Sequence, residues 1–137
     1  MHRLDPHSGG IKIPPAVQRH TEHRILSHVA AHHAGKFARI EVRFRGALCY
    51  IDAYAQPQEP TPDLLQVTDE TREEYLEHER ITPHHLCRLR YFGKEDEWSL
   101  ALYTHSHEKC EPRVFGNGNS YGTPEEAFDL AAALFAV

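Results

Sequence analysis

Residues 38–54 read ARIEVRFRG-ALCYIDAY, and residues 85–105 read HLCRLRYFG-KEDE-WSLALYTH. Both stretches alternate apolar and polar residues with the two-residue period of a half-buried β-strand. A two-residue loop at the Arg45-Gly46-Ala47 turn keeps the apolar set of the first stretch on one face, so a hairpin is predicted there. The residues expected to face the core are Ile40, Val42, Phe44, Cys49, Ile51, Ala53, Cys87, Leu89 and Tyr91.

The opposite side of the same strands holds arginine, tyrosine and acidic residues. These are Arg39, Glu41, Arg43, Arg45, Tyr50, Asp52, Tyr54, Arg88 and Arg90. Ser99, Ala101, Tyr103 and His105 would share that side if the alternation continues through 98–105. Small residues flanked by tyrosine and arginine would then form a shallow pocket there. The sequence therefore predicts a polar sheet face that is rich in arginine and tyrosine.

Helices are expected before, between and after the strand pairs. The first should begin at Pro14-Pro15 and end near Ala34, with Val17, Ile25, Leu26 and Val29 on its apolar side. An acidic helix should span about 70–79, with Thr71 and Glu74 at capping-box spacing. The last, over 124–136, follows the Thr123 N-cap and should bury Phe128, Ala131, Leu134 and Phe135.

This pattern predicts an α+β fold in the order α-ββ-α-ββ(β)-α. It has a single antiparallel sheet of four strands, or of five with the fifth at 113–115, and the helices lie on one face. At 137 residues the chain should form one domain over 13–137, after a flexible tail over 1–12. An acidic insertion at 57–81 has eight acidic residues against two arginines. Whether it covers the basic sheet face is left open.

Composition narrows the class of protein. The chain is 40% hydrophobic and 26% charged, which is typical of a globular domain, and its net charge of −5 does not favour a nucleic-acid binder. The longest apolar runs are too short for a membrane span, and the N-terminus lacks a signal-peptide core. Three cysteines, Cys49, Cys87 and Cys110, show no disulfide spacing. We expect a cytoplasmic protein with Cys49 and Cys87 buried as small apolar residues.

Three strings also resemble a known family. VRFRGALCYIDAY at 42–54, HLCRLRYFG at 85–93 and GTPEEAF at 122–128 are similar to a family of small uncharacterised bacterial proteins, over roughly 36–56 and 82–137. The resemblance carries over no activity, cofactor or catalytic residue. It implies a bacterial cytoplasmic setting.

The polar sheet face is the leading candidate for a binding site. Arginines suit bidentate contacts with phosphate or carboxylate, and tyrosines can stack on rings. The site residues predicted are Arg43, Arg45, Tyr50, Asp52, Tyr54, Arg88 and Arg90. We expect a small binding module that takes an anionic ligand or a protein partner there. The alternatives are a hydrolase-like enzyme that uses Asp52 or His105 as acid/base, a homodimer interface, or a solvated face with cross-strand ion pairs.

Metal and thiol chemistry are weaker candidates. His28 and His32 have the spacing of a metal-binding pair on a helix, but no HExxH string is present. Further ligands would have to come from His84, His85, His105, His107 or Cys110, and the sequence does not fix their positions. We therefore expect no bound metal and no cofactor. Cys110 lacks the local signature of a Cys–His enzyme.

Overall fold

The computed structural model describes residues 8–104 and 108–135, apart from the side chain of Phe135. Within this part the chain forms four helices and one antiparallel sheet of five strands, in the order β1-β2-β3-β4-β5. The predicted α+β fold is confirmed, with two helices in place of one between the strand pairs. The elements are α1 (Pro15–His32), β1 (Phe37–Arg45), β2 (Leu48–Ala55), α2 (Pro62–Thr68), α3 (Arg72–Ile81), β3 (His84–Tyr91), β4 (Trp98–Thr104), β5 (Lys109–Arg113) and α4 (Pro124–Phe135).

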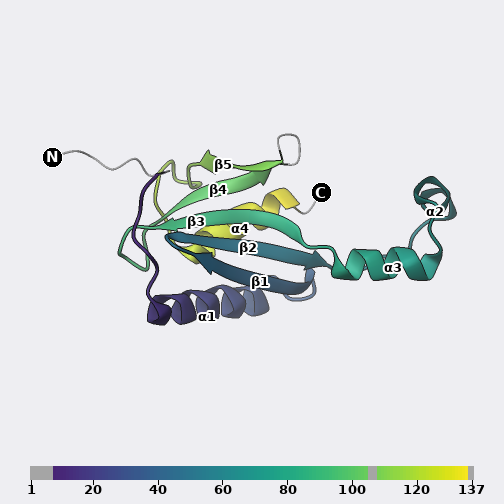
Figure 1. Cartoon of the computed structure of the whole chain (residues 1–137), viewed down its shortest axis with the longest axis horizontal. Coiled ribbons are helices and arrows are strands. Elements are labelled where there is room, and N and C mark those ends of the chain that lie inside the picture. The colour runs from purple at the N-terminus through teal and green to yellow at the C-terminus, as the bar shows by residue number, and fades with distance from the viewer. Residues whose placement is uncertain (1–7, 105–107, 136–137) are drawn as a thin grey trace.

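Helices α1 and α4 pack against one face of the sheet and against each other, which leaves the other face open (Figure 1). The alternating apolar residues supply the sheet side of the core, where Ile51 and Leu89 are fully buried. Ile25 from α1 and Phe128 from α4 complete it from the helix side. The predicted burial of Cys49 and Cys87 is confirmed.

The predicted turns and caps agree with the structure. Arg45 pairs with Leu48, so the first hairpin turns through two residues, and Gly46 there has a φ of +59°. The capping box of Thr71 and Glu74 begins α3. Thr123 caps α4, because its hydroxyl accepts from the backbone N–H of Glu126 at 3.1 Å.

The structure corrects the predicted positions of Leu26, Leu134 and the fifth strand. Leu26 and Leu134 are 41% and 61% exposed, because each helix buries a narrower stripe than its apolar residues suggest. The fifth strand pairs with β4 over Lys109–Arg113 rather than over 113–115. Pro112 is tolerated within it because β5 is an edge strand. The side chain of Phe135, also expected in the core, lies outside the described residues.

The acidic insertion does not lie over the open sheet face. Figure 1 shows α2 and α3 extending away from the end of the sheet, and neither helix has a buried residue. Val67 in α2 is 83% exposed and Ile81 at the end of α3 is 60% exposed. The arginine and tyrosine side chains of the sheet are therefore not covered by this segment of their own chain.

The end of the predicted tail docks on the sheet. The backbone N–H of Ile11 donates to Tyr91 O at 2.9 Å, and that of Ile13 donates to Gly46 O at the same distance. Ile13 is fully buried. Gly10, with a φ of +97°, has no room for a side chain, since an added Cβ would lie 2.7 Å from Tyr91 O. From about Gly9 the segment is thus part of the domain.

Candidate functional site

The open face of the sheet carries a continuous cross-strand row. Arg43 pairs with Tyr50, Tyr50 with Arg88, and Arg88 with Ala101. Cross-strand neighbours on one face lie about 5 Å apart, so their side chains can contact one another. The guanidinium of Arg43 lies over the Tyr50 ring, 5.3 Å from its centroid. The predicted two-residue period thus places arginine, tyrosine and a small residue side by side.

Beside this row the face is hollowed. The hollow has a volume of about 220 Å³, and its walls come from β1, β2, β3, β4 and β5. This volume suits a small molecule or one end of a larger one. The residues that line it are Arg43, Tyr50, Asp52, His85, Cys87, Tyr103, Lys109 and Cys110.

Asp52 forms the centre of the polar contacts in the hollow. Its side chain is 6% exposed, and both carboxylate oxygens are bonded. Oδ2 accepts from Nε and Nη2 of Arg43 at 3.1 and 2.9 Å, and Oδ1 lies 2.8 Å from Nδ1 of His85. An ionised carboxylate only accepts, so His85 donates through Nδ1. The two donors keep a buried carboxylate paired.

A β-bulge in β3 brings His85 to this face. Asp52 is opposite His85 while Ile51 is opposite Cys87, so Leu86 is an extra residue. In an unbroken strand, His85 would share the core-facing side with Cys87, and Leu86 would face solvent. With the bulge, Leu86 and Cys87 are both buried and His85 faces Asp52. Bulges often redirect a side chain in this way.

Strict alternation along the strand does not place His85 in the site, although the sequence contains a signal for its position. Leu86 and Cys87 are consecutive apolar residues in a strand that otherwise alternates. Such a pair indicates either a strand buried on both faces or a bulge. The His85 ring also packs on Tyr103, with centroids 5.0 Å apart, which fixes its orientation from the β4 side.

The remaining predicted residues are distributed around the hollow rather than within it. Tyr54 stacks under Arg39, whose guanidinium carbon is 4.1 Å from the ring centroid. Arg90 donates from Nη1 to Gly9 O at 2.8 Å and so helps hold the N-terminal segment. Arg45 is exposed at the β1 turn. His105, considered above as an acid/base, lies outside the described residues.

The positive and negative side chains around the hollow do not balance. Of the described residues that line it, Asp52 alone carries a carboxylate, and Arg43 and His85 are already bonded to it. Lys109 lines the hollow. Arg88 does not line it, but lies on the same face opposite Tyr50, which does, and its charge acts on the Cys110 thiol. Over residues 8–104 and 108–135, no ion pair joins Arg88 or Lys109 to an acid. The hollow therefore has an excess of positive charge.

The thiols are not activated for nucleophilic attack. Burial raises the pKa of Cys110 above its ordinary value, and the nearby charge of Arg88 only partly opposes this. Burial also raises the pKa values of Cys49 and Cys87. Reactive cysteines instead have lowered pKa values and partly exposed positions. A Cys–His mechanism is not supported by this arrangement.

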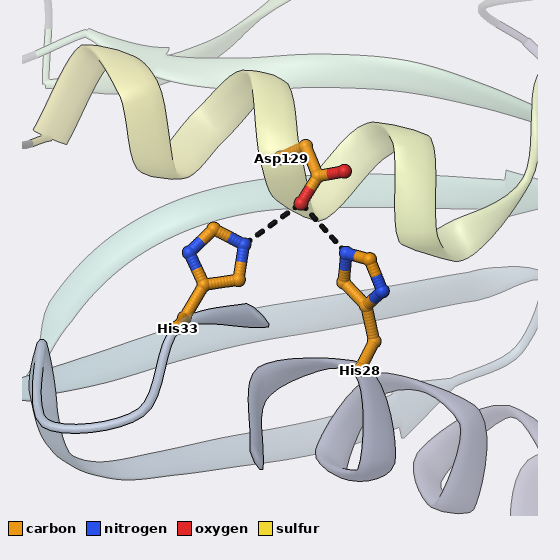
Figure 2. A group of neighbouring side chains, drawn as sticks. All are labelled: His28, His33 and Asp129. Atoms are coloured by element: carbon orange, nitrogen blue, oxygen red, sulfur yellow. Dashed lines mark hydrogen bonds and ion pairs between the residues drawn. The ribbon is translucent and has the colours of Figure 1, made fainter. Parts of the chain in front are cut away.

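A second polar cluster lies on the helix side of the sheet. Figure 2 shows His28 and His33 pointing at Asp129, whose Oδ1 lies 2.6 Å from His28 Nε2 and 2.7 Å from His33 Nε2. Burial opposes ionisation of Asp129, but the hydrogen bonds from His33 and His28 outweigh it, so its pKa is lowered. His28 contacts His32 through their rings, at 4.6 Å between centroids.

Comparisons with family models, with curated proteins and with solved structures found no match. The resemblance to a bacterial family thus stays a prediction, and the site must be interpreted from its own residues. Within the part of the chain that the structure describes, no helix has both the length and the apolar character needed to cross a membrane.

Proposed function

We propose that this protein is a binding module for a small anionic molecule, which it takes into the hollow on the open sheet face. One observation carries the proposal: the buried carboxylate of the hollow is already bonded to Arg43 and His85, while Arg88 and Lys109 add positive charge that no acid among the described residues neutralises through an ion pair. A phosphate or carboxylate would supply the missing negative charge. The ligand class is therefore a small molecule with one anionic group.

The rings around the hollow define the rest of the ligand. Tyr50 and Tyr103 supply flat apolar surfaces and hydroxyl groups, and the His85 ring packs on Tyr103. Pockets of this composition bind by apolar contact and orient the ligand through a few polar groups. An anionic group attached to a ring or a short apolar chain fits these walls better than an inorganic ion alone.

The test is a binding screen with a matched pair of variants. Inorganic phosphate, nucleotides, sugar phosphates and aromatic carboxylates are titrated by calorimetry at low and moderate salt. Arg88→Gln should weaken binding at least tenfold, while Arg19→Gln, the same charge change on the exposed surface of α1, should not. Binding should also weaken as salt is added, because exposed charges are screened over about 8–10 Å.

Two results would reject the proposal. Equal binding by both variants would place the ligand elsewhere. If no compound binds in a salt-sensitive way, the open face is better explained as an interface between two copies of the chain. Light scattering coupled to size-exclusion chromatography then measures whether a dimer forms and whether Arg88→Gln dissociates it.

A second candidate, a hydrolase-like enzyme, is favoured by the contact between Asp52 and His85. A carboxylate bonded to Nδ1 fixes the tautomer of a histidine and leaves Nε2 able to accept a proton. Nitrophenyl esters and phosphates are suitable probes. His85→Gln should abolish turnover but retain ligand binding if His85 is the base. Turnover that is absent in the parent protein, or unchanged in the variant, removes this candidate.

We also propose a reducing compartment, the bacterial cytoplasm, as the working location. Support comes from the thiols, since Cys49, Cys87 and Cys110 are all free cysteines. Free thiols persist where glutathione and thioredoxin keep them reduced. Fractionation of cells that produce the protein with its natural N-terminus tests this placement.

A further inference from the structure

The cluster of His28, His33 and Asp129 has the composition of a metal site. One donor atom from each residue lies within 4.8 Å of the other two. Two imidazoles and one carboxylate form a ligand set for first-row divalent ions, and zinc sites with three protein ligands leave a further position for water. The sequence led us to expect no metal because no third ligand was fixed in space. Helix α4 supplies that ligand as Asp129.

The chain path explains why His33 takes the position expected for His32. Residues five apart do not share a face of a continuous helix. Helix α1, however, ends at His32, and His33 is its C-cap with φ −129° and ψ 24°, outside the helical region. This change of direction points the His33 ring back toward α4, where its Nε2 bonds to Oδ1 of Asp129 (Figure 2).

The two imidazoles are held in place, and the carboxylate is accessible. The side chains of His28 and His33 are 15% and 14% exposed, against 53% for Asp129. The His33 ring packs edge-on against buried Phe128 at 5.0 Å, and the His28 ring packs on His32. A site whose rings are fixed by packing, with one side open to solvent, allows an ion to enter without rearrangement of the backbone.

The donor spacing requires only a small adjustment. Zinc lies about 2.0–2.2 Å from nitrogen and oxygen ligands, so neighbouring donors of a tetrahedral site are about 3.3 Å apart. The hydrogen-bonded atoms are 2.6 and 2.7 Å apart here. Side-chain rotations that open these two contacts by less than about 1 Å, and that bring the donors which lie up to 4.8 Å apart to about 3.3 Å, would admit the ion. The ion would then replace the two Nε2 protons that now bond to Asp129.

We propose that His28, His33 and Asp129 form a three-ligand site for a divalent transition-metal ion of the zinc class, which links α1 to α4. This site is independent of the anion hollow, because it lies on the helix-covered side of the sheet. Its role is to fasten the two helices. The coordination position that no side chain fills faces solvent, on the side of the site where Asp129 is exposed.

The experiment uses protein without an affinity tag and stripped with EDTA. Zinc is titrated by calorimetry, and cobalt is titrated by absorption, which reports the coordination geometry. One tightly bound ion per chain is expected, with a melting temperature that rises with metal concentration and returns after chelation. Separate substitutions His28→Gln, His33→Gln and Asp129→Ala should each weaken this binding at least tenfold.

The chain has twelve histidines, so adventitious binding needs a matched control. His23→Gln changes an exposed histidine on the same helix and should leave the tight site intact. Equal binding in His23→Gln and His33→Gln, or no stoichiometric binding by the parent protein, would overturn the proposal.

A second measurement does not depend on how the variants fold. Paramagnetic cobalt should broaden the ring signals of His28 and His33 in the parent protein before those of His23. Broadening spread evenly over the histidines would count against the site.

Discussion

Asp52 and Asp129 are each bonded to two basic side chains, but their surroundings are opposite. Asp52 is 6% exposed, and its two oxygens bond to different partners, Arg43 and His85. Asp129 is 53% exposed, and a single oxygen takes both His28 and His33. Arginine stays charged at every physiological pH, whereas imidazoles can give up a proton to a metal. The charge of Asp52 is therefore already neutralised by Arg43. At Asp129, by contrast, the two imidazoles can exchange their protons for a metal ion.

Phe128→Ala should break the second cluster and leave the first in place. Phe128 is fully buried, contacts Phe37 at 5.9 Å between centroids and supports the His33 ring. Loss of a buried aromatic side chain costs about 3–5 kcal/mol. Urea unfolding checks this. Leu134→Ala, at an exposed position on the same helix, should change the free energy of unfolding by less than about 0.5 kcal/mol. A melting temperature unchanged by Phe128→Ala would show that α4 is not docked.

Asp52→Asn and Asp129→Asn compare the two carboxylates directly. An asparagine at 52 offers one acceptor oxygen in place of two, so its amide N–H₂ faces Arg43, or His85 must change tautomer so that Nδ1 accepts, and in both cases the charged partner of Arg43 is lost. This mismatch in a buried position should cost about 1–3 kcal/mol. An asparagine at 129 can still accept from both imidazoles through its oxygen and expose its N–H₂ to water, at a cost below about 1 kcal/mol. Urea unfolding in EDTA measures both, and equal costs would refute the comparison.

Glu125 shows how an arginine partner affects a carboxylate that lies on the same helix as Asp129. It lies on α4 beside Asp129 but pairs with an arginine, accepting from Arg24 Nε and Nη2 at 2.9 and 2.8 Å. Burial raises its pKa, but the bonds from Arg24 outweigh this and hold the pKa below the ordinary value of about 4.5. The stabilisation is thus complete above that pH and is lost as the pH falls through the lowered value.

Glu125→Gln should therefore be less stable than the parent protein by about 1 kcal/mol at pH 7. The difference should shrink as the pH falls below about 4.5, the ordinary pKa of a glutamate, and through the lowered pKa at which the parent carboxyl also becomes protonated. Urea unfolding of both proteins from pH 7 down to pH 3 measures it. A gap that stays constant over this range would mean that the pair contributes through packing rather than charge.

Arg88→Gln should have the smallest effect on stability. Arg88 is half-buried on the open face, and no ion pair holds it within the described part of the chain. Its substitution should change the free energy of unfolding by no more than about 0.5 kcal/mol, although it should weaken anion binding. A large loss of stability would assign Arg88 a structural role and would weaken the anion-site proposal.

The two-residue period predicted the strands, their core side and the grouping of Arg43, Tyr50 and Asp52. These follow from local alternation, which a sheet with one buried face preserves. The burial of Asp52 could not be predicted, because it depends on neighbours from β1 and β3. The positions of His85 and His33 were missed for a related reason. Each lies where a regular element is interrupted, by a bulge in β3 and by the end of α1.

The extra residue in β3 also has a consequence for aligning related sequences. A regular strand one residue shorter, without both Leu86 and the bulge, would still bring a histidine opposite Asp52, because removing one residue and removing the bulge each change the face of the histidine and so cancel. Relatives that carry H-x-R and relatives that carry H-x-x-R could thus build the same contact. An alignment that forbids a gap inside a strand would match His85 with a core residue in the shorter form and would hide the shared site.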